Sequence, residues 1–243
     1  MSSIEEKLKK MEVRFDQEEY VVIDNGTGFI KAGFSGQDLP RLVIPTVVGE
    51  HIEPIDPSMQ TNVNDVQVEK KTYAFGNAAY QRKDTHSLYE PIKRGIMSRD
   101  GKTDWDNMEL IWQHIFNELN LETKNVNLLI TDSPFAEKCD RQMMAEILFD
   151  RFKVKSLQIM NTAALSMYST GKVTGLICES GEALTYTVPI FEGYALPHAY
   201  QKLEVAGQDV TQRLIDQLEE VGIKVKGHRE HVRSLKEQMC SIS

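Results

Sequence analysis

The sequence predicts an α/β fold, and three features predict it. A β-branched run at residues 21–23 ends in the turn residues Asp24, Asn25 and Gly26, as a buried strand does before a tight turn. From residue 104 onward, segments with a helical apolar period alternate with short apolar runs of strand length. Hydrophobic residues make up 41% and charged residues 26% of the 243 residues, which is enough for a sizeable core.

Residues 1–18 are predicted to form an N-terminal amphipathic helical extension. Apolar side chains at positions 4, 8, 11 and 15 recur at helical spacing, and Ser2 with Glu5 has the pattern of a capping box. A narrow apolar stripe of this kind either packs on its own domain or docks on a partner. Both alternatives stay open.

Strands and an insertion are expected next. The apolar runs 30–34 and 42–44 follow the first strand closely and predict an antiparallel meander. Residues 50–72 contain Pro54, Pro57 and several asparagines but few large hydrophobic residues. We expect an exposed, mobile insertion there.

The remaining elements continue the alternation. Helices are expected at residues 104–119, 137–152, 162–168, 210–220 and 229–240. Strands are expected at residues 126–131 and 157–160, and two more flank the turn at Ser180 and Gly181.

Charge and cysteine content exclude several functions. The 28 Lys and Arg residues against 36 Asp and Glu give a net charge of -8, which argues against direct binding to nucleic acid or to an anionic membrane. Cys139, Cys178 and Cys240 are too widely spaced to suggest a disulfide framework or a thiolate metal site. No apolar run approaches the roughly 20 residues of a membrane span. A soluble intracellular protein is therefore expected.

The turn at residues 24–28 has the chemistry of a phosphate cradle. Its glycines leave successive backbone N–H groups accessible, Asp24 could hold a hydrated divalent cation, and Lys31 could neutralise phosphate charge. The alternative is that Asp-Asn-Gly is only a favoured hairpin turn. A similar strand, acid and glycine turn recurs at residues 176–182, which indicates two related halves.

Several segments, in order, resemble the actin and actin-related protein family. They are residues 20–28 (YVVIDNGTG), 31–34 (KAGF), 131–134 (TDSP), 187–198 (TVPIFEGYALPH) and 206–211 (AGQDVT). The resemblance extends over nearly everything from Tyr20 to Cys240.

This resemblance implies an actin-like nucleotide-binding fold, the type shared with heat-shock chaperone ATPases and sugar kinases. The first lobe, residues 19–168, would be complete and the second, residues 169–243, partial. ATP or ADP with Mg²⁺ would bind between the lobes. The residues implied to hold it are Asp24, Gly26, Thr27, Gly28 and Lys31 in the first turn, Glu179, Ser180, Gly181 and Glu182 in the second, and Gly207, Lys236 and Glu237 near the nucleoside, with Asp24 also at the metal.

The sequence also departs from the family pattern. The second turn reads Glu-Ser-Gly-Glu-Ala at residues 179–183, where the family has Asp-Ser-Gly-Asp-Gly. The family glutamine that positions the attacking water aligns with Glu146, and a family histidine aligns with Tyr186. Residues 99–103 form an insertion foreign to conventional actin. Hydrolysis is the activity most exposed to these departures, because it depends on placing one water in line with the γ-phosphate. No catalytic residue is assigned.

A partial second lobe would leave apolar helix faces uncovered. The side chains expected to be exposed are Leu214, Ile215, Leu218, Val232, Leu235 and Met239. Such a face should dock on a partner, since large apolar patches on soluble proteins mark interaction sites.

The sequence therefore predicts an actin-related structural subunit of a larger assembly, in which nucleotide binding is possible but degenerate. Its partners would be proteins, including other actin-fold or cytoskeletal proteins, in the cytoplasm and cytoskeleton, with ciliary and nuclear complexes left open. The main alternative is a working actin that hydrolyses ATP and forms filaments. A kinase of the same wider fold is a weaker third reading, because the detailed matches are to actin-like chains.

Overall fold

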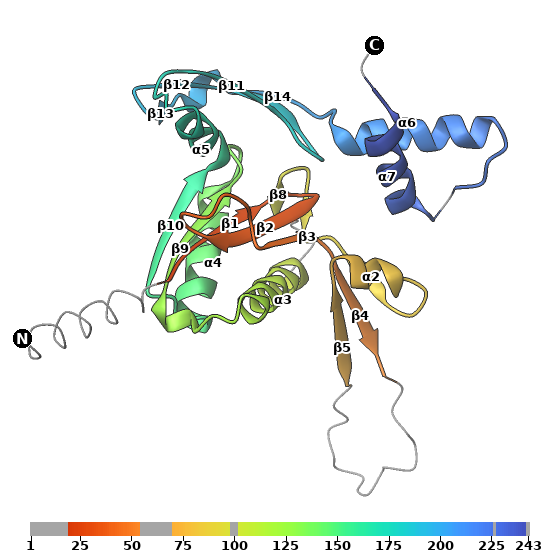
Figure 1. Cartoon of the computed structure of the whole chain (residues 1–243), viewed down its shortest axis with the longest axis horizontal. Coiled ribbons are helices and arrows are strands. Elements are labelled where there is room, and N and C mark those ends of the chain that lie inside the picture. The colour runs from red at the N-terminus through yellow and green to blue at the C-terminus, as the bar shows by residue number, and fades with distance from the viewer. Residues whose placement is uncertain (1–18, 54–69, 98–101, 226, 242–243) are drawn as a thin grey trace, which may run out of the picture.

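The computed structural model describes residues 19–53, 70–97, 102–225 and 227–241 (Figure 1). The strands are β1 (Glu19–Asn25), β2 (Phe29–Phe34), β3 (Leu42–Pro45), β4 (Val48–Ile52), β5 (Lys71–Phe75), β6 (Ser87–Tyr89), β7 (Ile92–Lys93), β8 (Ile96–Met97), β9 (Val126–Asp132), β10 (Ser156–Asn161), β11 (Gly175–Ser180), β12 (Thr185–Phe191), β13 (Tyr194–Ala195) and β14 (Gln201–Leu203). The α-helices are α2 (Asn77–Gln81), α3 (Lys102–Glu118), α4 (Lys138–Glu146), α5 (Thr162–Ser169), α6 (Gly207–Glu220) and α7 (Arg229–Met239). The predicted α/β class is confirmed.

A five-stranded sheet in the order β10-β9-β1-β2-β3 forms the centre of the first lobe. β1 pairs with β9 in parallel and with β2 antiparallel, and β2 pairs antiparallel with β3, which confirms the predicted meander. Val21 and Ile23 of β1 are buried while Tyr20 and Val22 point to the exposed side. Buried and exposed side chains therefore alternate along β1, as in a strand with one face on the core, and this alternation sets its register.

The helices α3 and α4 cover this sheet and bury the main core. The apolar positions of α3 recur at helical spacing, so Ile111, Trp112 and Ile115 are fully buried. The helix predicted at residues 137–152 is only partly confirmed, because α4 ends at Glu146 and a single π-helical turn, Ile147–Arg151, follows. That wider turn buries both Ile147 and Leu148.

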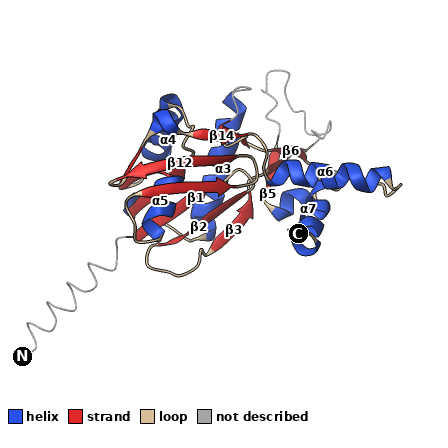
Figure 2. Ribbon diagram, turned by 90° about the horizontal axis from the view of Figure 1, so that it is seen from above, coloured by secondary structure: helices blue, strands red, loops and turns tan. Residues whose placement is uncertain are grey.

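A four-stranded sheet of β11, β12, β13 and β14 forms the second lobe together with α6 and α7. The helix α5, in which the predicted lobe boundary at residue 168 falls, packs Ala163 and Met167 against Val188 and Ile190 of this sheet. Figure 2 shows α6 and α7 together at one end of the molecule. No helix in the described part of the chain is long and apolar enough to cross a membrane.

The predicted insertion at residues 50–72 is wrong at both ends. Residues 50–52 belong to β4 and residues 71–72 to β5, and these strands pair antiparallel as a projecting hairpin (Figure 1). Pairing of β4 with β6 on its other side, together with an ion pair between Glu50 and Lys71, supplies partners that the local sequence does not reveal. Residues 54–69, the predicted helix at 1–18 and most of the insertion at 99–103 lie outside the described residues.

The uncovered face predicted on the C-terminal helices is also partly wrong. α6 and α7 pack on each other, so Ile215 and Val232 are buried. Leu214 and Leu218 are half-buried, whereas Leu235 and Met239 are exposed as expected. The remaining apolar surface is therefore smaller than the sequence implied.

Ile115→Ala should lower the free energy of unfolding of the first lobe by about 2–5 kcal/mol, because it leaves a cavity in the main core. The chain's two tryptophans, Trp105 and Trp112, both lie on α3, so urea unfolding followed by tryptophan fluorescence reports on this lobe. Gln113→Ala at an exposed position of the same helix is the control, with a change within about 0.5 kcal/mol. Equal losses in both variants would contradict this packing.

Acid should destabilise the three-stranded sheet of β4, β5 and β6 near His86. The His86 ring lies 5.2 Å from that of His51, and burial together with His51 and Arg82 lowers the pKa of His86 below its ordinary 6.5. The unfolded chain therefore takes up this proton at a higher pH than the folded chain, so stability is retained above pH 6.5 and lost as the pH falls through the folded pKa. Hydrogen exchange in β4 and β6, corrected for intrinsic rates, should accelerate between pH 7.5 and pH 5.5.

His86→Gln should remove that pH dependence, whereas His198→Gln, at an exposed position of the second lobe, should leave it unchanged. A pH dependence that survives in His86→Gln would assign the effect to another group.

Candidate functional site

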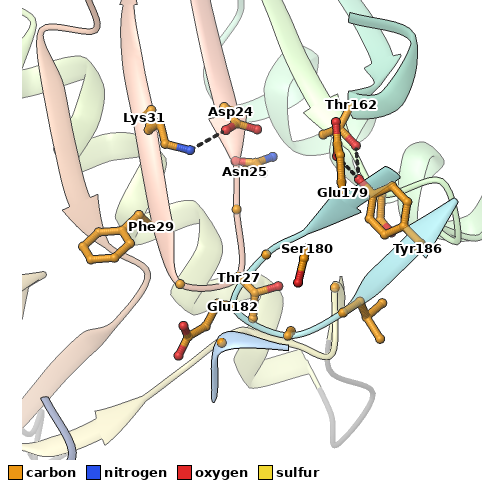
Figure 3. A pocket seen from close by; sticks show the side chains of 18 of the residues that line it. Asp24, Asn25, Thr27, Phe29, Lys31, Thr162, Glu179, Ser180, Glu182 and Tyr186 are labelled. Atoms are coloured by element: carbon orange, nitrogen blue, oxygen red, sulfur yellow. Dashed lines mark hydrogen bonds and ion pairs between the residues drawn. The ribbon is translucent and has the colours of Figure 1, made fainter. Parts of the chain in front are cut away.

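A cavity of about 550 Å³ lies between the β1–β2 turn and the β11–β12 turn (Figure 3). We call residues 24–28 the first turn and residues 179–184 the second turn. The cavity lining includes all twelve residues that the sequence indicated, namely Asp24, Gly26, Thr27, Gly28, Lys31, Glu179, Ser180, Gly181, Glu182, Gly207, Lys236 and Glu237. The structure thus brings together residues that are more than 200 positions apart in the chain.

Asp24 is held at the mouth of the first turn by two contacts. It faces Lys31 directly across the β1–β2 ladder, and its Oδ2 accepts from the Lys31 Nζ at 3.0 Å. Its Oδ1 accepts from the Thr131 hydroxyl at 2.8 Å. The carboxylate and the ammonium both stay partly exposed to the cavity, at 34% and 50% of their side-chain surface. A fixed acid and a fixed cation therefore stand side by side where a charged ligand would enter.

Thr131, which the sequence analysis did not assign to the site, connects the first turn to the core. It is the penultimate residue of the parallel strand β9 beside β1, and its hydroxyl accepts from the backbone N–H of Asn25 at 2.9 Å. The Asn25 side-chain oxygen in turn accepts from the buried Trp112 indole at 3.2 Å. The position of Thr131 at the carboxyl end of a strand next to β1 was the available signal.

The glycines of the first turn are required by close approach. A Cβ on Gly26 would lie 2.4 Å from the Phe29 carbonyl oxygen, and a Cβ on Gly28 would lie 2.9 Å from the Glu182 Cβ. The first and second turns therefore touch at Gly28 and Glu182, with no space for a side chain between them. The buried hydroxyl of Thr46 donates to the Gly26 carbonyl at 2.7 Å and fixes the turn from the other side.

The second turn is bound to the start of α6. The backbone N–H groups of Gly207 and Gln208 donate to the carbonyls of Gly181 and Glu182 at 3.0 and 2.8 Å. A Cβ on Gly207 would lie 3.2 Å from the Gly181 carbonyl oxygen, so a glycine suits this contact. The first N–H groups of α6 are consequently satisfied within the protein.

Lys236 lies over the same helix start. Its Nζ donates to the Gly207 carbonyl oxygen and to the Thr211 hydroxyl, both at 2.9 Å. The neighbouring Glu237 lines the cavity and is exposed. Lys236 therefore holds α7 against α6 as well as facing the cavity.

Glu179 is enclosed by hydrogen bonds. One carboxylate oxygen accepts from the Ser166 hydroxyl, and the other accepts from the Tyr186 hydroxyl, which stands directly opposite on the β11–β12 ladder. The Tyr186 oxygen also lies 2.9 Å from the Thr162 hydroxyl (Figure 3). Burial and the Glu179 carboxylate raise the pKa of Tyr186 far above its ordinary 10, so this phenol stays protonated and remains a donor. The Glu and Tyr departures from the family pattern therefore fit each other.

Glu182 has a different environment. Burial raises the pKa of this carboxyl above its ordinary 4.5, while the cations Arg233, Lys236 and Arg229 act in the opposite direction. The Glu182 Cβ packs on Gly28, and Glu182 forms part of the cavity lining.

A divalent cation fits this site only if most of its ligands come from phosphate and water. Within the described residues, no group of three or more His, Cys, Asp or Glu side chains is placed to hold a metal ion. Magnesium in nucleotide sites commonly uses one or two carboxylates and takes its other ligands from phosphates and water. Asp24, with its partly exposed carboxylate, suits that arrangement, and Glu179 suits it less because each of its oxygens already accepts a hydrogen bond.

Glu146, which aligns with the family's water-positioning glutamine, is not among the residues that line the cavity. Glu146 is the last residue of α4, whereas Thr162, the first residue of α5, does line the cavity. The cavity lining formed by the described residues contains neither glutamine nor histidine. The site therefore lacks those two side chains for orienting a water.

Comparison with known families agrees with this geometry. The family model described as Actin matches residues 15–241, nearly the whole chain. The chain therefore belongs to the actin family. The resemblance seen in the sequence and the actin-like fold are both confirmed.

Gly26→Ala should lower the free energy of unfolding by about 1–3 kcal/mol, because the new methyl group overlaps the Phe29 carbonyl and the first turn must move. Gly181→Ala is the matched control in the second turn, because its Cβ would meet only the Leu184 carbonyl oxygen, at 3.9 Å. Urea unfolding of both variants without added ligand makes the comparison. Equal stability of the two variants would show that the first turn is not tightly packed.

Proposed function

We propose that this chain is an actin-related structural subunit of a larger protein assembly, whose pocket binds a nucleotide with Mg²⁺ but does not turn ATP over efficiently. The observation that supports this most is the enclosure of Glu179 by Ser166 and Tyr186. An acid whose two oxygens each already accept a hydrogen bond has fewer lone pairs left to accept from a metal-bound water. The pocket would thus bind a nucleotide without hydrolysing ATP efficiently.

The first turn supports nucleotide binding. Its glycine backbone, Asp24 and Lys31 supply N–H donors, a site for a hydrated cation and a positive charge for phosphate. Four acids but only two lysines line the cavity, so a bare polyphosphate would be repelled. A divalent cation would supply the missing positive charge, and binding should depend on it.

Exposed apolar side chains support a role in an assembly. Val221 and Ile223, between α6 and α7, and Leu235 and Met239, on α7, are all more than 40% exposed. Such a surface favours protein partners, for which the cytoskeleton and cytoplasm are the proposed setting, and the chain's net charge of -8 disfavours nucleic acid and anionic membrane.

The alternative is a working actin that hydrolyses ATP and forms filaments. The intact pair of Asp24 and Lys31 is the observation that favours it. A measured ATP turnover that Asp24→Ala abolishes would favour this alternative and overturn the proposed separation of binding from hydrolysis.

Lys31→Met should weaken Mg²⁺-dependent ATP binding about 10- to 100-fold, the range expected when a charge-assisted hydrogen bond to phosphate is lost. Isothermal titration calorimetry with ATP, with and without Mg²⁺, measures the change. Lys172→Met, at an exposed lysine outside the cavity, should bind like the unaltered chain. Equal affinities in the two variants, or tight binding without a divalent cation, would contradict the proposed role of the first turn.

A further inference from the structure

Arg94 is placed where the two lobes meet. It lies in the tight turn between β7 and β8 of the first lobe, with a φ of 50°. A non-glycine residue with positive φ is uncommon and persists only where surrounding contacts favour it. The contacts of the Arg94 side chain therefore need an explanation.

The guanidinium of Arg94 makes all of its contacts with the second lobe. Nη1 and Nη2 donate to the two carboxylate oxygens of Asp209 at 2.9 and 3.0 Å, a bidentate ion pair. Nη1 also donates to the carbonyl oxygens of Ala183 and Glu204, both at 3.2 Å. When the Gln208 amide is oriented with its oxygen toward Arg94, that oxygen accepts a hydrogen bond from the Arg94 Nε at 2.8 Å. One side chain thus holds the second turn, the segment after β14 and the start of α6.

These partners are the segments that shape the pocket. Asp209 caps α6 by accepting from the Ala206 N–H at 3.0 Å, and the next N–H groups of α6 hold the carbonyls of the second turn. Gly95, beside Arg94, lines the cavity, and a Cβ there would lie 3.0 Å from the Leu184 side chain. Arg94 therefore acts on the second turn directly through Ala183 and indirectly through Asp209.

The other prominent contacts between the lobes are simpler. The Nζ of Lys83 donates to the Gly227 carbonyl at 2.6 Å, and the Arg233 guanidinium lies 4.6 Å from the Phe29 ring centre. Neither includes a bidentate ion pair. A planar guanidinium that fits a carboxylate with two parallel bonds fixes orientation as well as distance.

We propose that Arg94 is the positioning residue of the pocket, which holds the second turn against the first lobe so that both turns face each other before any ligand enters. This role does not depend on whether a nucleotide binds. It goes beyond the proposed function, because it makes the closed arrangement of the lobes a property of the chain alone.

The chain's own cysteines offer the measurement. Cys139 on α4 and Cys240 after α7 are exposed and belong to different lobes, and replacing Cys178 by Ser leaves only these two for spin labels. Distances measured by pulsed electron resonance, without nucleotide and with a chelator, should form one narrow distribution. In Arg94→Gln the distribution should broaden and shift to longer distances.

Arg151→Gln is the matched control, because Arg151 forms an exposed ion pair with Glu109 within the first lobe. It should keep the narrow distribution. Circular dichroism and tryptophan fluorescence verify that each variant is folded. An unchanged distribution in folded Arg94→Gln would overturn the proposal.

Asp209→Asn provides an independent test should Arg94→Gln fail to fold. Its side-chain oxygen can still cap α6 while the charged partner of Arg94 is lost, so it should broaden the distribution as well. The double variant should be no broader than Arg94→Gln, whereas additive broadening would mean that the two residues act separately and would overturn the proposal. Calorimetry that finds no nucleotide binding would overturn the proposed function and leave this result unaffected.

Discussion

The parallel pairing of β1 with β9 places Thr131 beside Asp24 and Asn25, and the shape of the first turn depends on that contact. One hydroxyl donates to the Asp24 carboxylate and accepts from the Asn25 N–H, so it fixes both the acid and the backbone that follows it. The buried Trp112 indole fixes the Asn25 side chain from the core. These hydrogen bonds to the rigid core thereby hold in place a turn that has little apolar contact of its own.

The second turn depends on the first. Gly28 and Glu182 pack without space for a side chain, and Arg94 and α6 hold the second turn from behind. Close backbone contact of this kind explains why glycine is needed at Gly28 without any reference to a ligand. The same contact fixes the backbone of Glu182, whose side chain forms part of the cavity lining.

The sequence predicted the parts of the site that depend on local pattern. The β-branched strand before Asp24, the duplicated turn at Glu179 and the resemblance to a known family together identified twelve residues that line one cavity. It did not predict contacts that depend on tertiary partners. Residues 50–52 and 71–72 form strands because β4 and β5 pair with each other while β6 pairs with β4 on its other side. The cavity lining includes Thr162, the first residue of α5, but not Glu146. Arg94 carried no local signal, since its partners lie 89 to 115 positions away.

The two halves of the pocket share one strand arrangement but differ in the side chain that pairs with the acid. In each half an acid ends a strand and meets a partner seven positions later, directly across an antiparallel ladder. In the first half the partner is Lys31, and the pair leaves a partly exposed carboxylate and a cation facing the cavity. In the second half it is Tyr186, whose neutral hydroxyl joins Ser166 in occupying both oxygens of Glu179. A ligand would therefore meet charge on one wall and a closed hydrogen-bond network on the other. Such a pocket favours holding a phosphate over orienting a water between two acids, and this is the physical argument behind the structural role that we propose.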